Sequence, residues 1–348
     1  MDASDLELLN GFQRDFPLVS RPFQHIAEQL GRDETEVLAA LRRWRGEGKI
    51  SRVGAVFAPR KLGVSTLAAL AVPPTRLDAV AEQINSYPEV NHNYQREHAF
   101  NLWFVLTAAS STRLHAILTE IQQHTGLPLL DLPLLEEFHI DLAFDLRDGG
   151  PQRAPSRTAV TDVRPAVALS TFDRELLAML QPGLPLVAQP YRALADALGV
   201  SERWVIERLR NWFEHGLIKR LGVIVRHREL GYRANAMVVW DLPDARISAV
   251  GRALAVEAGV NLCYRRPRRL PAWPYNLFCM MHGRERHEVL ERIDAVRVRH
   301  QLMDYPHAVL FSTRCFRQRG ACYLPTPVLS AKAEHRRVSE LEAMAWTS

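Results

Sequence analysis

Three side chains that can handle a carboxylate occupy alternate positions in one short segment: Tyr94, Arg96 and His98. Alternate residues of a β-strand point to the same face of the sheet, so we expect these side chains to converge there. Arginine binds a carboxylate through two parallel N–H donors, tyrosine adds a hydroxyl donor, and histidine exchanges a proton near neutral pH. The spacing therefore predicts a carboxylate-processing site. The alternative is that His98 is a hydrogen-bonded structural residue beside Phe100.

A second set of candidate residues lies between Gly259 and Gly283, a stretch without aspartate or glutamate. It contains arginines and aromatic residues, namely Arg265, Arg266, Arg268, Arg269, Tyr264, Trp273 and Tyr275. Arginine keeps its charge in a partly buried carboxylate site, and the rings offer flat apolar surface. We expect an anion-binding surface here, with a solvated hairpin tip as the alternative interpretation.

The sequence contains no motif for an organic cofactor. It has no Gly-rich dinucleotide fingerprint, no phosphate-binding P-loop and no lysine in a pyridoxal phosphate context. The four cysteines, Cys263, Cys279, Cys315 and Cys322, form no C-x-x-C pair, which disfavours a zinc site and a thiol-redox motif. We expect free thiols, no cofactor and no resident metal.

Length and composition favour a folded protein of two or three domains. The chain has 348 residues, of which 47% are hydrophobic and 24% charged. Its net charge of +5 is compatible with an anionic partner. No apolar run approaches the roughly 20 residues of a membrane-spanning helix, and the acidic N-terminus lacks the layout of a signal peptide. We therefore expect a cytoplasmic protein without a membrane partner.

The second half of the chain repeats the first. At an offset of 168 residues the identities include Pro22/Pro190, Gly31/Gly199, Trp44/Trp212, Arg52/Arg220 and Gly54/Gly222. The offset then drifts to between 170 and 175, as small insertions would produce. Identities at a nearly constant offset indicate a tandem duplication.

Each repeat has the pattern of two small domains. Three helical segments and a short strand are typical of a winged helix-turn-helix, and the following β-α-β-β-α-β order is typical of a ferredoxin-like domain. In the first repeat we expect one last strand within residues 129–140, and in the second a last strand around 308–312. The predicted fold class is α+β, a tandem duplication of this domain pair. The predicted boundaries are 1–60 and 61–146 for the first pair, 147–168 for a linker, 169–228 and 229–325 for the second pair, and 326–348 for a C-terminal tail.

The winged helices raise a rival hypothesis, a DNA-binding transcription regulator. DNA binding needs basic side chains at phosphates and side chains that reach base edges. The first recognition helix instead begins with Asp33, Glu34 and Glu36, which would face phosphate unfavourably. The second recognition helix carries Arg203 and Arg208 and is less unfavourable for contact with phosphate. On balance, this pattern disfavours DNA as a partner.

The domain order resembles the Lrp/AsnC regulators, and longer segments resemble the siroheme decarboxylases. Residues 92–104 (HNYQREHAFNLWF) are similar to one subunit type of that family, NirD. Residues 263–267 (CYRRP), 273–277 (WPYNL) and 311–320 (FSTRCFRQRG) are similar to the partner type, NirL. The two types follow each other in one chain, so the sequence resembles the fused NirD–NirL form of this Lrp/AsnC-like family.

The resemblance implies conversion of siroheme to 12,18-didecarboxysiroheme with release of two CO2, in heme d1 biosynthesis. Siroheme is a flat iron tetrapyrrole with eight carboxylates, so its site needs cations at the rim, apolar walls and a proton donor. His98 is then the expected proton donor or orienting acid, and Arg96 and Tyr94 hold a carboxylate. The iron belongs to the substrate, and its candidate axial ligands are His98 and His92.

Further residues are expected to bind siroheme and its decarboxylated products: Tyr264, Arg265, Arg266, Arg268, Arg269, Tyr275, Trp273, His92 and Arg314. A basic strand end is the alternative interpretation of Arg314. The sequence leaves open whether one or both halves catalyse, and whether the protein is a pseudo-dimeric monomer or a homodimer. The alternative function is an Lrp/AsnC-like regulator that responds to heme.

Overall fold

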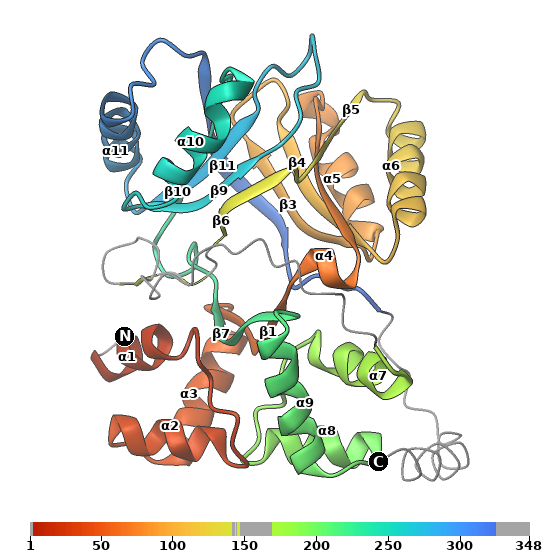
Figure 1. Cartoon of the computed structure of the whole chain (residues 1–348), viewed down its shortest axis with the longest axis vertical. Helices are drawn as coiled ribbons and strands as arrows, with labels where there is room; N and C mark the ends of the chain where they lie inside the picture. Colours follow the sequence, from red (N-terminus) through yellow and green to blue (C-terminus); the bar gives the residue numbers. More distant parts are fainter. Residues whose placement is uncertain (1–2, 141–142, 144, 147–168, 325–348) are drawn as a thin grey trace.

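The computed structural model describes residues 3–140, 143, 145–146 and 169–324. The predicted linker at 147–168 and the predicted tail at 326–348 lie outside these residues. Figure 1 shows two lobes, a helical lobe with both winged helices and a sheet lobe with both ferredoxin-like units. Each lobe therefore combines one segment from each half of the chain, and the two repeats fold side by side.

The helical lobe contains two copies of a three-helix unit with a wing strand. Its elements are α1 (Ala3–Gly11), α2 (Pro22–Leu30), α3 (Glu34–Gly46), β1 (Ile50–Phe57), α7 (Thr171–Leu180), α8 (Pro190–Leu198), α9 (Glu202–Glu214) and β7 (Ile218–Val225).

Capping residues set the ends of these helices. Asp33 forms a capping box with Glu36 at the start of α3, and the Ser201 hydroxyl accepts a backbone N–H at the start of α9. Helices α2 and α8 begin with a proline and end at Gly31 and Gly199, whose φ angles are 61° and 68°. Glycine adopts this left-handed conformation without steric cost, so the same stop signal works in both repeats.

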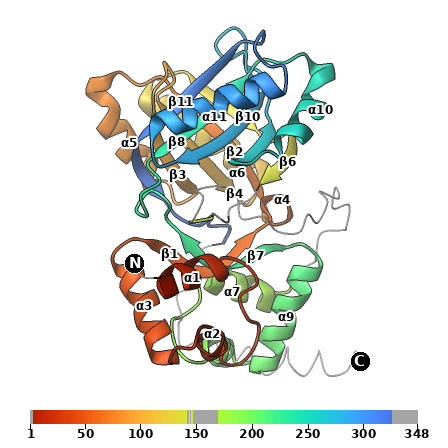
Figure 2. The ribbon, with the colours of Figure 1, turned by 90° about the vertical axis from the view of Figure 1, so that its left-hand side faces the viewer.

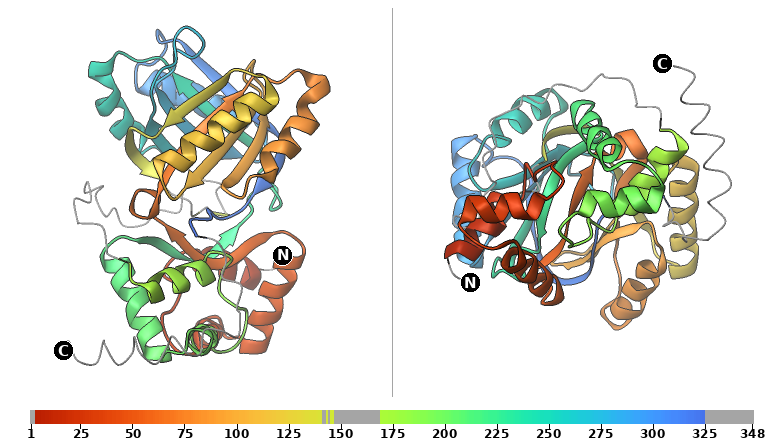
Figure 3. Two further views of the ribbon diagram at one scale, coloured as in Figure 1. Left: turned by 90° about the vertical axis from the view of Figure 1, so that its right-hand side faces the viewer. Right: turned by 90° about the horizontal axis from the view of Figure 1, so that it is seen from below.

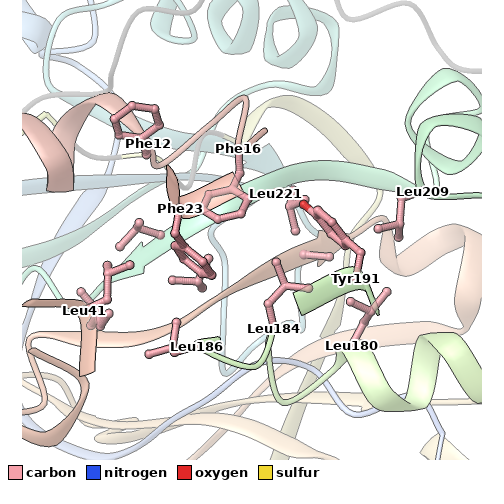
Figure 4. Packing of buried hydrophobic residues seen from close by; sticks show 14 of the residues in the cluster. Phe12, Phe16, Phe23, Leu41, Leu180, Leu184, Leu186, Tyr191, Leu209 and Leu221 are labelled. Carbon is pink, nitrogen blue, oxygen red and sulfur yellow. The ribbon is translucent and has the colours of Figure 1, made fainter. Parts of the chain in front are cut away.

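The two winged helices share one hydrophobic core. Phe23 of the first unit and Tyr191 and Leu209 of the second are buried in a single cluster (Figure 4). Strand β1 pairs antiparallel with β7, with Gly54 opposite Gly222. The two wings therefore form one ribbon, which lies between the helices and the sheet lobe (Figure 2).

The sheet lobe contains the two ferredoxin-like units. The first comprises α4 (Pro59–Leu62), β2 (Val64–Leu70), η1 (Pro74–Arg76), α5 (Leu77–Ser86), β3 (Val90–Arg96), β4 (Leu102–Ala108), α6 (Ser111–Thr125), β5 (Leu129–Pro133) and β6 (Glu136–Ile140). The second comprises β8 (Ala234–Trp240), α10 (Asp244–Leu254), β9 (Val260–Arg265), β10 (Leu277–Gly283), α11 (Arg286–Arg299) and β11 (His307–Gln318). Throughout the described ranges, no helix combines the length and apolar character that crossing a membrane requires.

All these strands form one nine-stranded sheet in the order β5-β2-β4-β3-β11-β8-β10-β9-β6. Each unit follows the β-α-β-β-α-β order, which confirms the predicted fold class. Helices α5 and α6 cover one unit and α10 and α11 the other, all on the outer face of the sheet (Figure 3). A separate apolar cluster, which includes Trp103, Trp273 and Phe278, fills the inner face between the units.

Two segments cross from one unit to the other. Strand β11 pairs with β8 through its first part and with β3 through its second part. The segment 129–140 does not form the single strand that we expected. It divides into β5, which pairs with β2, and β6, which pairs with β9 of the other unit. Strand β11 is also longer than the expected 308–312, because the partner unit supplies a neighbour for its extension.

Two asparagines hold equivalent places in the two units, directly before strands β4 and β10. Asn101 donates to the carbonyl of Val72 at 2.8 Å and accepts its backbone N–H at 2.9 Å. Asn276 makes the same two bonds to Leu242, at 2.8 and 3.0 Å. One amide thus satisfies both backbone groups of a buried residue that has left its strand.

We expect Asn101→Ala to lower the free energy of unfolding by about 2–4 kcal/mol, because it leaves two buried backbone groups of Val72 without a partner. The matched control is Gln123→Ala on the exposed face of α6, which should change stability by less than about 0.5 kcal/mol. Denaturant unfolding of both variants checks this. Equal stability of the two variants would contradict the assigned role of Asn101.

Candidate active site

Tyr94 and Arg96 point to the inner face of the sheet. Asn93, between them, donates to the Ala81 carbonyl of α5 on the outer face, so its neighbours face the other way. The guanidinium of Arg96 lies 5.9 Å from the centroid of the Tyr94 ring. Its Nη1 donates to the Leu310 carbonyl at 3.0 Å. The structure therefore brings Tyr94 and Arg96 together.

The charge of Arg96 has no acidic partner among the described residues. The side chain is deeply enclosed, since the residue is only 8% exposed. Burial lowers the pKa of Arg96, and the nearby phenols of Tyr264 and Tyr94 act in the opposite direction. An unpaired buried charge is costly, so this position is suited to a ligand that brings a negative charge.

His98 does not share the strand face with Tyr94 and Arg96, contrary to our expectation. Strand β3 ends at Arg96, and the chain turns through the next residues before β4 begins. The His98 ring instead packs against Trp273, with centroids 5.4 Å apart, and its Nδ1 accepts the backbone N–H of Phe100 at 3.0 Å. Alternation applies only within a strand, and the turn ends it before His98.

Three other histidines gather near Arg96. The ring of His92 stacks on Tyr94 at 6.1 Å, and the rings of His227 and His282 meet edge-to-face at 4.5 Å. Each is electrostatically coupled to the next: His92 to His227, His227 to His282, and His282 to Arg96. We call these four residues the Arg96 cluster.

All three histidines of the cluster have lowered pKa values, mainly because of burial. The pKa of His92 falls to about 4, with Arg52 as a second cause. The pKa of His227 also falls to about 4, with His92 and Arg228 as further causes. The pKa of His282 lies well below its ordinary value because of burial, and then because of His227 and Arg96. The histidines are therefore neutral at pH 7 in the unliganded protein.

The wings of the helical lobe bring further cationic or protonatable residues to the Arg96 cluster. His227 and Arg228 directly follow β7, and Arg228 donates to the Thr313 carbonyl at 2.9 Å. Arg52 lies on β1 and donates to the Ala55 carbonyl at 3.1 Å, while its buried Nε has no partner among the residues that the structure describes. Cationic groups of both lobes thus meet at the Arg96 cluster.

Sequence reasoning missed His227, His282 and Arg52 as functional candidates. The two histidines stand in different elements of the second repeat, and no local spacing joins them to the Tyr94 segment. Arg52 was visible only as an identity shared with Arg220. The pairing of β3 with β11 and the docking of the wings decide this neighbourhood, and neither leaves a local pattern.

The arginine-rich segment is not an unpaired cationic surface. Arg268 bonds Asp241 at 2.7 Å and Asp244 at 2.9 Å, and Arg265 lies 3.7 Å from Asp244. The segment itself contains no acidic residue. Its acidic partners are Asp241, just before α10, and Asp244, at the start of α10, about 25 positions earlier in the chain. These two side chains are therefore not free cations in this structure, and their contact with substrate stays a prediction.

The neighbouring arginines are also engaged within the protein. Arg266 donates to the Leu132 carbonyl and lies 4.6 Å from the Tyr264 ring centroid. Arg269 donates to the backbone carbonyl of Asp131 at 2.7 Å. These contacts fasten the segment to β5 of the first unit, which is a structural role.

Among the remaining expected residues, Trp273 is part of the core. It is fully buried, with its ring 5.0 Å from Trp103 and 4.9 Å from Tyr275. Arg314 forms an exposed ion pair with Asp78 and was expected at the substrate. The extension of β11 carries Arg314 to the outer face beside α5, because Cys315 rather than Arg314 is opposite Tyr94.

The chain matches two family models, each of them twice. The siroheme decarboxylase NirDL-like helix-turn-helix domain matches residues 5–50 and 173–219, and the AsnC-like ligand binding domain matches residues 61–139 and 229–317. The siroheme decarboxylase NirDL subunit of Paracoccus denitrificans is 49% identical over 322 residues, which cover 92% of this chain and 97% of that protein. This chain belongs to the siroheme decarboxylase NirDL family.

NirDL-family relatives also match half of the chain at a time. The siroheme decarboxylase NirD subunit of Pseudomonas aeruginosa is 53% identical over 146 residues, 42% of this chain and 97% of that subunit. The solved structure of a siroheme decarboxylase NirDL in complex with an iron-uroporphyrin III analogue has a TM-score of 0.66 and 27% identity. It covers 98% of both chains.

In this NirDL-family chain two of the three arginines of helix α9 hold the helical lobe together, whereas Arg203 is exposed and pairs with Glu207 of the same helix. Arg208 is bound by the buried carboxylate of Asp173, and Arg210 donates to the Leu18 carbonyl at 2.9 Å. Side chains committed in this way are not available for phosphates. The regulator hypothesis is therefore not favoured.

We expect the unliganded protein to lose stability as the pH falls from 7 to 5. In the unfolded chain His227 titrates near 6.5, whereas in the folded chain its pKa is about 4. The unfolded state therefore binds more protons in this window, and the free energy of unfolding falls as the pH falls through it. Each such histidine contributes about 1–2 kcal/mol to this loss.

His227→Gln should flatten the pH dependence of the unfolding free energy by that amount. The matched control is His115→Gln on the exposed face of α6. Denaturant unfolding at pH 7, 6 and 5 checks this, and parallel curves for the two variants would contradict it.

Proposed function

We propose that this chain is a siroheme decarboxylase that converts siroheme to 12,18-didecarboxysiroheme, with release of two CO2, in heme d1 biosynthesis. The substrate carries eight carboxylates on a flat ring, and the Arg96 cluster offers cationic or protonatable groups on an otherwise apolar inner face. The observation that carries the proposal is the buried Arg96, which has no acidic partner in the described part of the chain and lies near three histidines.

Access to the cluster is compatible with this role. His92 and His227 keep partly exposed surface, yet burial is the main cause of their lowered pKa values. The aromatic rings of Tyr94 and Trp103, paired across β3 and β4, supply apolar surface beside the cluster.

The reaction needs no redox partner. Cleavage of the bond between the acetate methylene and its carboxylate releases CO2 and leaves the electron pair on the methylene carbon. The conjugated ring delocalises that pair, and one proton then completes a methyl group. The protein must therefore hold the spectator carboxylates and deliver one proton for each CO2 released.

Arg96 and Tyr94 hold a substrate carboxylate in this proposal, and the histidines of the cluster supply protons. A bound carboxylate would raise the pKa values of His92, His227 and His282 toward neutrality, because an opposite charge favours the protonated imidazole. His98 keeps its predicted role as an orienting residue. With Nδ1 engaged by Phe100, its Nε2 is the ring nitrogen left to face substrate.

The iron is part of the substrate, with His98 and His92 as candidate axial ligands, and the proposal requires no organic cofactor. The described residues contain no grouping of three His, Cys, Asp or Glu side chains arranged to hold a resident metal ion. Because the two units pair their sheets within one chain, we propose that a pseudo-dimeric monomer is the working form. A cytoplasmic location stays a prediction from the sequence.

Anaerobic incubation with siroheme, followed by mass analysis, tests the activity. We expect the wild-type protein to remove two carbon dioxide units. Arg96→Gln should lower kcat/KM by at least about 100-fold, because it removes a charge-assisted carboxylate contact from a water-poor site. Arg113→Gln, which removes an exposed arginine on α6, should retain wild-type turnover. Unchanged siroheme with the wild-type protein would refute the function.

Binding should also take up protons. The heat of binding of iron-uroporphyrin III to the protein is measured by calorimetric titration at pH 7. Its dependence on the ionisation enthalpy of the buffer should reveal net proton uptake. The double variant His227→Gln/His282→Gln should lose most of this uptake, since two of the groups whose pKa values rise are then missing. The His115→Gln control should keep it. Binding without proton uptake by the wild-type protein would contradict the assigned role of the histidines.

A further inference from the structure

Two cysteines face each other across neighbouring strands of the second ferredoxin-like unit. Cys263 of β9 lies directly opposite Cys279 of β10. The Cys279 thiol donates to the Cys263 sulfur across 3.3 Å. Both residues are fully buried in the apolar core that the sheet shares with α10 and α11. The proposed decarboxylation makes no use of either thiol, so the pair calls for an explanation of its own.

The backbone holds the two sulfurs where a disulfide can close. The Arg265 carbonyl accepts the N–H of Leu135, on the side of β9 that faces away from β10. Backbone groups of a strand alternate between its two neighbours, so Cys263 also turns its own away from β10. Cys263 and Cys279 therefore form a non-hydrogen-bonded pair, in which opposite Cα atoms lie only about 4.5 Å apart. Disulfides span Cα separations of about 4.4–6.8 Å.

The matching place in the first unit shows that the fold does not require cysteine here. At that place Asn93 lies opposite Phe104. Asn93 donates to the Ala81 carbonyl of α5 at 3.2 Å. Cys263 donates to the matching carbonyl of α10, that of Gly251, at 3.5 Å. A thiol is only a weak donor, so this hydrogen bond does not account for a cysteine, still less for two.

We propose that Cys263 and Cys279 are a redox modification site, which a hydroperoxide converts to a reversible disulfide within the folded protein. One thiol is first oxidised to a sulfenic acid, and hydrogen peroxide leaves as one water. The second thiol then displaces the sulfenic oxygen as another water, and the S–S bond forms. The two thiols lose two electrons and two protons in total, and the peroxide takes up both. This chemistry goes beyond the proposed function and does not depend on it.

The surroundings of the pair determine how the oxidation proceeds. Burial raises the pKa of the Cys279 thiol, and the contact with Cys263 is a second cause. The thiolate is the reactive form, so oxidation is slow at pH 7 and becomes faster as the pH rises. Once one sulfur is oxidised, the other already lies beside it. Closure of the disulfide therefore precedes further oxidation to a sulfinic acid.

A bond at this place would fasten the two strands that frame the loop of residues 266–276. On the inner face the neighbouring rings of Tyr264 and Phe278 stack at 5.8 Å, and Trp273 of the loop stacks on Phe278 at 6.0 Å. Tyr264 also acts electrostatically on Arg96. A disulfide on the outer face therefore restrains the strands whose inner face lies near the Arg96 cluster.

The first test is peptide mapping of the full-length wild-type protein. The reduced protein is treated with hydrogen peroxide at pH 8, the remaining thiols are blocked with iodoacetamide, and the protein is digested with trypsin. We expect peptides 253–265 and 270–284 to be joined with the loss of two hydrogen atoms, and dithiothreitol to separate them. Recovery of both peptides as blocked thiols or sulfinic acids, while the partly exposed Cys322 is oxidised, would overturn the inference.

The second test uses the matched variants Cys279→Ala and Cys322→Ala. Cys322→Ala should give the joined peptides in wild-type yield, and Cys279→Ala should give none. Peroxide should also raise the urea concentration at which the wild-type protein unfolds, because the disulfide restricts the unfolded chain. It should not raise the midpoint of Cys279→Ala. If the joined peptides appear only when urea is present during oxidation, the two sulfurs do not meet in the native fold and the inference fails.

Discussion

The two halves of the protein are held together by strand segments that cross between them. Strand β11 serves both units, and the segment containing β5 and β6 does the same from the other side. Backbone hydrogen bonds fix strand register, so this crossing sets which side chains of one unit meet those of the other. Tyr94 faces Cys315 for this reason, and the Arg96 guanidinium reaches the Leu310 carbonyl of β11. Without this crossing, the inner face of one unit would not be held against the inner face of the other.

Arg96 is buried, and among the described residues no carboxylate compensates its charge. A buried arginine without a carboxylate destabilises the empty fold, and the three neighbouring histidines reduce that cost by staying neutral. Their lowered pKa values keep further positive charge away from Arg96 at pH 7. In the proposed complex, substrate carboxylates would compensate the Arg96 charge and raise the pKa values of the histidines, so binding would stabilise the fold.

Duplication and divergence explain why the two halves look alike yet differ chemically. Both halves keep the tyrosine–arginine pair and the asparagine that bonds the backbone of a buried residue. They also keep the helix caps. Each of these features satisfies polar groups that folding buries. The three histidines of the Arg96 cluster, by contrast, have no histidine at the matching position of the other repeat. In the helical lobe, Arg208 and Arg210 of α9 bind within the protein, to Asp173 and to the Leu18 carbonyl. A winged-helix architecture is thus retained as a support whose wings carry His227 and Arg52 to the sheet.

The sequence by itself determined the duplication and the fold class, and it predicted that Tyr94 and Arg96 share one face of a strand. These follow from repeated identities, hydrophobic periodicity and strand alternation, which are all local or periodic signals. Tertiary structure alone decided that Arg268 is neutralised by Asp241 and Asp244, that His98 leaves the strand face, and that His227 and His282 join Arg96. The reason is physical: charge compensation and pKa values depend on neighbours in space, and segments far apart in the chain supply them here.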